Sequence, residues 1–326
     1  TVANILVAVP VVLWWCLRQR SGAGLSRSAR LAAAFLLAVC VCIWPVTLRN
    51  RIVSGQWVPI STNAGINLFV GNNPDMDTTL SIRPGLDWER LVARPFREGA
   101  AEDERDAEAY FLRRVRRYAV GHPWAFAAGL ARKAWWLTGA HEIPRNIDPY
   151  VFADRSALLQ PLLWRAGPFA FPGGIVLPLA LVGAVVLRTR SRKAGGMLAI
   201  LALYLGSLVL FFPSSRYLAP MQPWLIVLAV AGAVGTYGAI RHGGRSRRRL
   251  PLLLAAALVF VNLPRSGPAD EVDFESELDR HVGIAFQVRG RKQEALDLYN
   301  RVLAQDPADA DAWFYRGTVL RELGQR

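Results

Sequence analysis

Residues 49–74 read RNRIVSGQWVPISTNAGINLFVGNNP and follow directly on an apolar segment. They open a polar, aromatic-rich region that no further apolar segment interrupts until about residue 167. Gly65 and Gly71 permit turns that other residues adopt only with strain, and aromatic residues such as Phe69 give the region apolar surface for packing. The stretch is also rich in side chains that form hydrogen bonds, namely Ser61, Thr62, Asn63, Asn67, Asn72 and Asn73. We expect a compact loop of this kind, held at the end of apolar segments, to bind a ligand.

The composition and the charge pattern indicate a membrane protein. Of the 326 residues, 52% are hydrophobic, and the mean hydropathy is +0.22. The net charge is +14, but the short loops 18–30, 188–193 and 241–249 carry basic residues and no acidic ones, and each joins two apolar segments. This is the positive-inside pattern of cytoplasmic membrane loops rather than a groove that follows phosphates, so we expect no nucleic-acid partner.

Six apolar segments are expected to form transmembrane helices. They are residues 2–17, 31–48, about 167–187, 194–212, 217–240 and 250–263. The last has only 14 residues, and it can cross a bilayer if the flanking arginines snorkel. With the basic loops in the cytoplasm, alternation places the long loop 49–166, the turn 213–216 and the tail from Pro264 outside. The chain begins without Met inside an apolar run, so we expect it to be a piece of a longer protein.

Two amphipathic helices are expected inside the long loop, over residues 103–118 and 122–138. The second is rich in tryptophan, and indole rings prefer the interface between membrane and water. Either the two helices lie on the membrane surface or they pack on a core of the loop itself. The sequence favours neither arrangement.

The tail carries a repeat of 34 residues. Glycines recur at this spacing in the pairs Gly283/Gly317 and Gly290/Gly324. A small residue, an aromatic residue, a terminating proline and the first residue of a second unit stand where a tetratricopeptide unit has them, namely Ala295, Tyr299, Pro307 and Trp313. The tail therefore resembles the tetratricopeptide repeat family, although Asp279 and Arg316 replace apolar residues. One and a half units cannot bury a solenoid core, so we expect further repeats to follow and a protein partner to bind them.

The predicted fold class is an all-α multi-pass membrane protein with about six transmembrane helices and a large extracytoplasmic loop. The membrane domain is residues 1–263, the linker is 264–275, and the truncated repeats of the C-terminal α-solenoid are 276–326.

Signatures of soluble enzymes are missing from the sequence. It contains no GxxxxGK, HExxH or GxSxG motif. The four histidines, His122, His141, His242 and His281, lack metal-ligand spacing, so no metal site is expected. The three cysteines, Cys16, Cys40 and Cys42, lie in apolar segments, where we expect small buried hydrophobic residues and no disulfide framework.

Two further stretches concentrate polar side chains outside the predicted membrane. HEIPRNIDPYVF, at 141–152, includes Glu142 and Arg145, and PSSRYLAPMQP, at 213–223, includes Arg216 and Tyr217. The guanidinium of Arg216 could offer its planar fork to a lipid-linked phosphate. The alternatives are an interfacial arginine that contacts headgroups and, at 141–152, a loop tied down by its own hydrogen bonds.

A resemblance covers roughly residues 30–263. WPVTLRNRIVSGQWVPISTNAGINLFVGNNP, EIPRNIDPYVF and SSRYLAPMQPWLIVLA occur in this order around the membrane segments. Together they resemble the C-terminal half of bacterial membrane glycosyltransferases related to dolichyl-phosphate-mannose–protein mannosyltransferases, which have the GT-C superfold. The resemblance implies transfer of a sugar from a polyprenyl-phosphate donor to an acceptor at the outer face of the bacterial inner membrane.

What the resemblance implies for individual residues is limited by the region that it covers. The catalytic carboxylate of such enzymes usually lies nearer the N-terminus than this chain extends, so the catalytic residue is unknown and the chain alone is expected to be inactive. The donor phosphate is assigned to Arg216, Tyr217 and Arg145, because cations offset the charge of the departing lipid phosphate. Substrate binding is assigned to Asn63, Asn67, Asn72, Asn73 and Glu142. No cofactor is assigned, and a divalent metal would have no identifiable ligands here.

Two other functions compete with this one. A non-catalytic membrane anchor could present the repeats as an assembly scaffold, in which case the asparagines of 61–74 are only structural. A transporter of lipid-linked sugars is disfavoured, because its membrane segments would carry ionisable residues and these segments contain essentially none.

Overall fold

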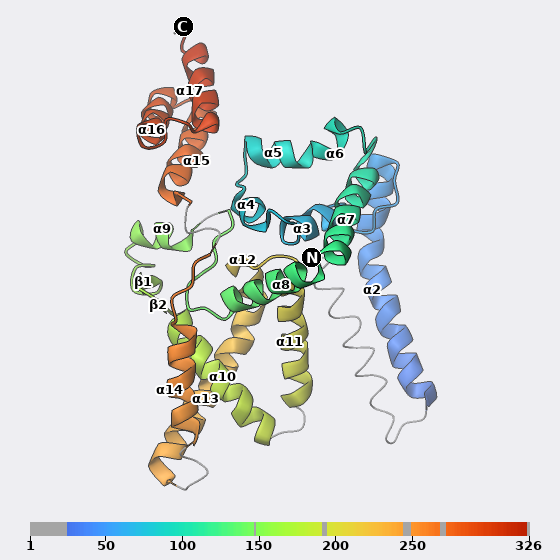
Figure 1. Ribbon diagram of the computed structural model, residues 1–326, viewed down its shortest axis with the longest axis vertical. Helices are drawn as coiled ribbons and strands as arrows, with labels where there is room; N and C mark the ends of the chain where they lie inside the picture. The colour runs from blue at the N-terminus through green and yellow to red at the C-terminus, as the bar shows by residue number, and fades with distance from the viewer. Residues whose placement is uncertain (1–24, 147, 191–193, 244–248, 268–271, 325–326) are drawn as a thin grey trace.

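The computed structural model describes residues 25–146, 148–190, 194–243, 249–267 and 272–324, and within these ranges the fold is mostly helical (Figure 1). The expected apolar segment 2–17 lies outside the described residues. Figure 1 shows the apolar helices between residues 173 and 261 at one end of the molecule and the helices of the loop and of the tail toward the other, while the first long helix runs along the side.

Three described helical segments are long and apolar enough to cross a membrane: Ala29–Ser54 within α2 (Leu25–Ser54), Gly173–Arg190 as α10, and Ser215–Arg241. The third comprises α12 (Ser215–Leu218), the short 3-10 helix η2 (Ala219–Met221) and most of α13 (Gln222–His242). The expected segments 194–212 and 250–263 form the shorter helices α11 (Ala194–Leu210) and α14 (Arg249–Val261). At 1.5 Å per residue α14 is about 20 Å long, against about 30 Å for a hydrocarbon core.

Helices α10 and α13 pack at close range through glycines. A Cβ on Gly183 would lie 1.8 Å from the carbonyl oxygen of Leu228, and a Cβ on Gly232 would lie 2.0 Å from that of Leu179. Small residues at a crossing let two helix backbones approach, which is the usual way in which membrane helices pack. Helix α14 lies beside both α10 and α13.

A small hairpin replaces the first residues of the predicted third membrane segment. Strands β1 (Trp164–Ala166) and β2 (Phe169–Phe171) pair antiparallel around a turn at Gly167, which has φ +57°. The fold is therefore not entirely α, and α10 begins at Gly173 rather than near residue 167. Alternating aromatic residues explain the hairpin, because the rings of Trp164 and Phe171 stack across it at 5.9 Å.

The long loop has a hydrophobic core of its own. It contains the short helices α3 (Ala64–Val70), α4 (Met76–Ser81), α5 (Leu86–Val92), α6 (Arg94–Arg97) and α9 (Pro149–Asp154), and the two longer helices α7 (Glu104–Gly121) and α8 (Pro123–Leu137). Helix α7 packs against α3 and buries Tyr110 and Phe111 in that core. Of the two arrangements left open above, α7 therefore adopts the one in which it packs on the core of the loop. Helix α8 also contributes to this core through Trp136, whereas Trp124, near its start, is 86% exposed.

The tail forms three helices, α15 (Phe274–Val288), α16 (Lys292–Gln305) and α17 (Ala310–Glu322), here called the repeat module. Asp273 accepts hydrogen bonds from the first turn of α15, so this helix begins slightly before the predicted boundary at 276. Ala295 and Tyr299 are fully buried, and the Tyr299 ring occupies the space beside Gly283. The tail leaves α14 at the loop end of the apolar helices, where the indole of Trp136 donates to the carbonyl of Ser266.

Candidate functional site

The structure brings together the three stretches that the sequence singles out. The side chain of Asn72 donates to the Leu210 carbonyl oxygen at 2.7 Å, at the end of α11. Further along, the main-chain N–H of Ile143 donates to the Ser215 hydroxyl at 2.6 Å, and the Ser215 N–H donates to the Ile143 carbonyl at 3.0 Å. Residues 71–73, 141–145 and 210–217 therefore form one continuous polar layer at the end of the apolar helices.

A buried lysine joins two of these stretches. Lys133, on α8, is fully buried, and its ammonium donates to the Gly71 carbonyl at 2.8 Å, to Asn72 Oδ1 at 2.9 Å and to the Phe211 carbonyl at 3.2 Å. No carboxylate is among these acceptors. Gly71 permits the contact, because a Cβ there would lie 1.8 Å from the Phe211 carbonyl oxygen.

The titration of Lys133 should make the free energy of unfolding depend on pH. Burial lowers the pKa of this ammonium from 10.5 to about 7. Between these two values the unfolded chain binds a proton that the folded chain has released, so the free energy of unfolding rises with pH. Between pH 7 and 9 we expect wild type to gain stability relative to Lys133→Met, by at most about 1.4 kcal/mol per pH unit. Melting of both proteins in detergent, followed by circular dichroism, measures the difference. A difference that falls as pH rises contradicts the prediction.

Two of the predicted substrate-binding asparagines are structural elements of the loop. Asn72 and Asn73 are both 3% exposed. The amide of Asn73 donates to Phe69 and Thr79 and accepts from the main-chain N–H of Asp75, which fixes the turn between α3 and α4. Asn63, at the start of α3, is exposed, and Asn67 is half-buried.

Arg145 is half-buried between the segment 80–82 and Phe212, which follows α11. Its guanidinium donates to the carbonyls of Leu80 and Ile82 and stacks over the Phe212 ring at 5.2 Å. Burial lowers its pKa to about 10, with a further contribution from the positive charge of Arg83. These contacts are those of a residue that orders the loop.

The predicted phosphate-binding turn lies at the same end of the molecule. Arg216 is exposed on α12. The ring of Tyr217 packs on Phe212 at 5.6 Å, and its carbonyl accepts a hydrogen bond from the Tyr204 hydroxyl. Arg145, Arg216 and Tyr217 line neither of the two adjoining cavities described next.

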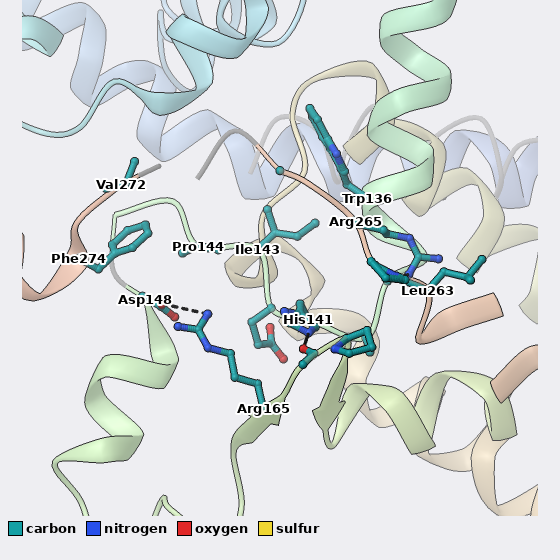
Figure 2. Close-up of a pocket in the computed structure, with 17 residues that line it drawn as sticks. Trp136, His141, Ile143, Pro144, Asp148, Arg165, Leu263, Arg265, Val272 and Phe274 are labelled. Carbon is teal, nitrogen blue, oxygen red and sulfur yellow. Dashed lines mark hydrogen bonds and ion pairs between the residues drawn. The ribbon is translucent and has the colours of Figure 1, made fainter. Parts of the chain in front are cut away.

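A cavity of about 550 Å³, here called the polar cavity because charged side chains line part of it, lies between the loop, the hairpin and the start of the tail (Figure 2). Its charged or ionisable lining residues are His141, Glu142, Asp148, Arg165 and Arg265. Figure 2 shows Val272 and Phe274 on one side of this cavity and Leu263 and Arg265 on the other.

Hydrogen bonds and ring contacts hold these side chains in place. Arg165 lies 3.9 Å from the buried carboxylate of Asp148 and stacks over the Tyr150 ring at 4.8 Å. His141 Nε2 is 3.0 Å from the carbonyl oxygen of Gly167. Burial raises the pKa of the Tyr150 hydroxyl, which accepts a hydrogen bond from the main-chain N–H of Glu142.

Arg265 contributes a second cation to the polar cavity. It stacks over the Trp135 ring at 4.2 Å and donates to the carbonyls of Val261 and Phe260 at the end of α14. Its buried Nε has no hydrogen-bond partner, and burial lowers its pKa. Because the Arg265 side chain lines the cavity, its positive charge favours an anion bound there.

An apolar cavity of about 270 Å³ adjoins the polar one. It lies between α10, α11 and α13, where aliphatic side chains such as Leu201 and Leu225 line it. The two cavities share the segment 139–143, and Glu142 is the carboxylate that lines both. The predicted substrate-binding residue Glu142 therefore stands where an apolar chain in one cavity would meet a polar group in the other.

Sequence reasoning missed several residues of this site. Arg165 and Arg265 lie about 100 residues apart, each in a segment without a recognisable motif. Lys133 sits in ARKAWW, whose basic pair is typical of a solvated helix face. Within the described part of the chain, no group of three or more His, Cys, Asp or Glu side chains could hold a metal ion.

Comparison with known proteins identifies part of the tail. Residues 298–325 match the family model described as tetratricopeptide repeat, in agreement with the expected repeat and with the helices of the repeat module. Among curated proteins and among solved structures, nothing matches the chain.

Proposed function

We propose that this chain is the C-terminal part of a membrane glycosyltransferase that takes a sugar from a polyprenyl-phosphate donor, joined to a tetratricopeptide module that binds a protein. The observation that carries the proposal is that an apolar and a polar cavity adjoin, with the segment 139–143 lining both. Such a pair suits an amphipathic ligand, because the apolar cavity removes hydrocarbon from water while the polar cavity keeps a charged group hydrogen-bonded.

In this proposal the first units of the polyprenyl chain enter the apolar cavity, and the rest of the chain stays in the bilayer. The phosphate then lies toward Arg265 and Arg165, whose charges offset that of the departing lipid phosphate. Glu142, at the junction, accepts hydrogen bonds from sugar hydroxyls. Arg216, on the exposed turn, is still predicted to contact the phosphate. The catalytic carboxylate is expected in a more N-terminal part of the whole enzyme.

The expected orientation of the chain in the membrane supports an extracytoplasmic site. The loop and the repeat module lie at one end of the apolar helices, opposite the ends at which α10 stops at Arg190 and α13 stops at His242, each of which is followed in the sequence by a basic loop (Figure 1). Basic loops favour the cytoplasm, so the proposal places the cavities and the repeats on the outer face of a bacterial inner membrane.

The test uses the whole protein that contains this chain, reconstituted with a polyprenyl-phosphate-linked sugar. We expect Glu142→Gln to reduce sugar release by about 10- to 100-fold, because a hydrogen bond to a charged group contributes about 1.5–3 kcal/mol. The matched control, Glu102→Gln, changes an exposed carboxylate of the same loop and should leave release unchanged.

Two further variants test the individual cavities. Ala184→Phe fills the apolar cavity and should weaken donor binding, whereas Ala127→Phe, on the exposed face of α8, should not. Arg216→Ala tests the phosphate contact at the turn. If wild type releases no sugar from any polyprenyl-phosphate donor, the transferase proposal is wrong.

The second candidate is a membrane-anchored scaffold, which the tetratricopeptide match favours. Tetratricopeptide repeats bind protein segments along their stacked helices. Under this function, partner binding to the repeats would survive both Glu142→Gln and Ala184→Phe, and reconstitution would show no sugar release.

A further inference from the structure

The repeat module forms part of the wall of the polar cavity. Phe274, the first residue of α15, and Val272, two residues before it, line the cavity opposite Leu263 and Arg265 (Figure 2). The position of the module relative to the loop therefore sets the shape of the proposed donor site.

One ion pair joins the module to the loop. Arg83, between α4 and α5, lies 3.9 Å from the carboxylate of Glu277 on α15 and 4.8 Å from the centre of the Phe274 ring. The same guanidinium donates to the main-chain carbonyl of Arg145. Arg83 thus connects the cavity wall at Phe274 to the stretch that carries Glu142.

This ion pair is buried but incompletely satisfied. The side chains of Arg83 and Glu277 are 11% and 6% exposed. Neither carboxylate oxygen of Glu277 has a hydrogen-bond partner, and Nε and Nη2 of Arg83 have none either. Burying two charges costs free energy that only a well-bonded pair recovers. The net free energy with which this pair holds the module on the loop is therefore small.

The charges around Glu277 come from both sides of the contact. Arg83 and Arg145 face it from the loop, and Arg280 and Asp309 face it from the module. Burial raises the pKa of Glu277, while the three arginines act in the opposite direction.

Two further polar contacts cross this boundary. Arg155 lies 3.6 Å from Asp279, and the N–H of Leu86 donates to the carboxylate of Asp311 at 3.1 Å. Among the described residues, the buried hydrophobic cluster of the module contains no loop residue, and that of the loop contains no module residue. Polar contacts between domains separate more readily than a shared apolar core.

We propose that the repeat module is a movable wall of the polar cavity, held closed by the Arg83–Glu277 pair, and that release of this contact opens the cavity. A protein partner that binds the repeats can then regulate access to the site. The regulatory role rests on the proposed function, but the motion itself does not.

The motion is measured by pulsed EPR between spin labels at Arg113→Cys on α7 and Asp297→Cys on α16, with Cys16, Cys40 and Cys42 replaced by alanine. Both label sites are exposed. Wild type should give one narrow distance distribution. Glu277→Arg places a like charge against Arg83, so the distribution should broaden toward longer distances. The matched control Glu294→Arg breaks an exposed pair inside the module and should leave the distances unchanged.

Opening of the cavity is measured separately, with a single cysteine at Ile143→Cys in the cysteine-free background. Glu277→Arg should increase its reaction rate with a maleimide about tenfold, whereas Glu294→Arg should not. Protection of the α16 amides from hydrogen exchange shows that the module itself stays folded. Unchanged distances in Glu277→Arg overturn the proposed latch, and longer distances with an unchanged labelling rate overturn the movable wall. Neither result depends on sugar release.

Discussion

Replacing Lys133 with methionine should loosen the whole polar layer. Methionine fills a similar volume but donates no hydrogen bond, so the Gly71 and Phe211 carbonyls and Asn72 Oδ1 lose their shared donor in a buried position. Each buried acceptor left unpaired costs about 1–3 kcal/mol, and the variant also avoids burying an ammonium. We therefore expect a net local destabilisation of about 3 kcal/mol. Amide exchange in α3 and α8 should accelerate about 100-fold, as measured by mass spectrometry.

The control for this variant is Lys292→Met. Lys292 lies on the surface of the repeat module and pairs with Glu322 at 3.4 Å. Exposed pairs of this kind contribute about 0–1 kcal/mol, so exchange in the loop should not change. Protection of α3 that stays at the wild-type level in Lys133→Met would contradict the view that this lysine holds the loop on α11.

The local features of the fold were predictable because short segments determine them. Asp103 accepts a hydrogen bond from the first turn of α7, and Pro123 stands at the first position of α8, so both predicted helices begin within two residues of their expected starts. Tyr299 and Ala295 are buried as the repeat pattern predicts. The order of the polar stretches also indicated that they lie at one end of the apolar helices.

The site was less predictable because tertiary packing decides it. Nothing in the sequence near Lys133 distinguishes a buried ammonium from a solvated one. The cation Arg265 reaches the polar cavity only because α14 returns the chain to the end where the hairpin holds Arg165. The sequence predicts Asn72 and Asn73 as substrate-binding residues, but sequence alone does not distinguish an asparagine that binds a ligand from one that ties its own turn.

Replacing Gly232 with leucine should separate α10 from α13. A Cβ on Gly232 would lie 2.0 Å from the Leu179 carbonyl oxygen and 2.9 Å from the Gly183 main-chain nitrogen, and backbone atoms cannot move aside as a side chain can. The two helices must therefore move apart along their contact, which also deforms the apolar cavity that they line. Since overpacking of a close contact costs about 1–3 kcal/mol or more, we expect the melting temperature in detergent to fall by several degrees.

The same helix provides a matched control, because Gly238 has open space where its Cβ would lie. Gly238→Leu adds the same side chain to α13 and enlarges its apolar surface without a clash with any backbone atom. Its melting temperature should therefore equal that of wild type or be slightly higher. The decisive measurement is the difference between the two variants, since any general effect of leucine on helix propensity or detergent binding is common to both. Equal melting temperatures would show that the α10–α13 contact does not depend on Gly232. A lower melting temperature for Gly232→Leu alone, accompanied by weaker donor binding, would connect this close helix crossing to the shape of the apolar cavity.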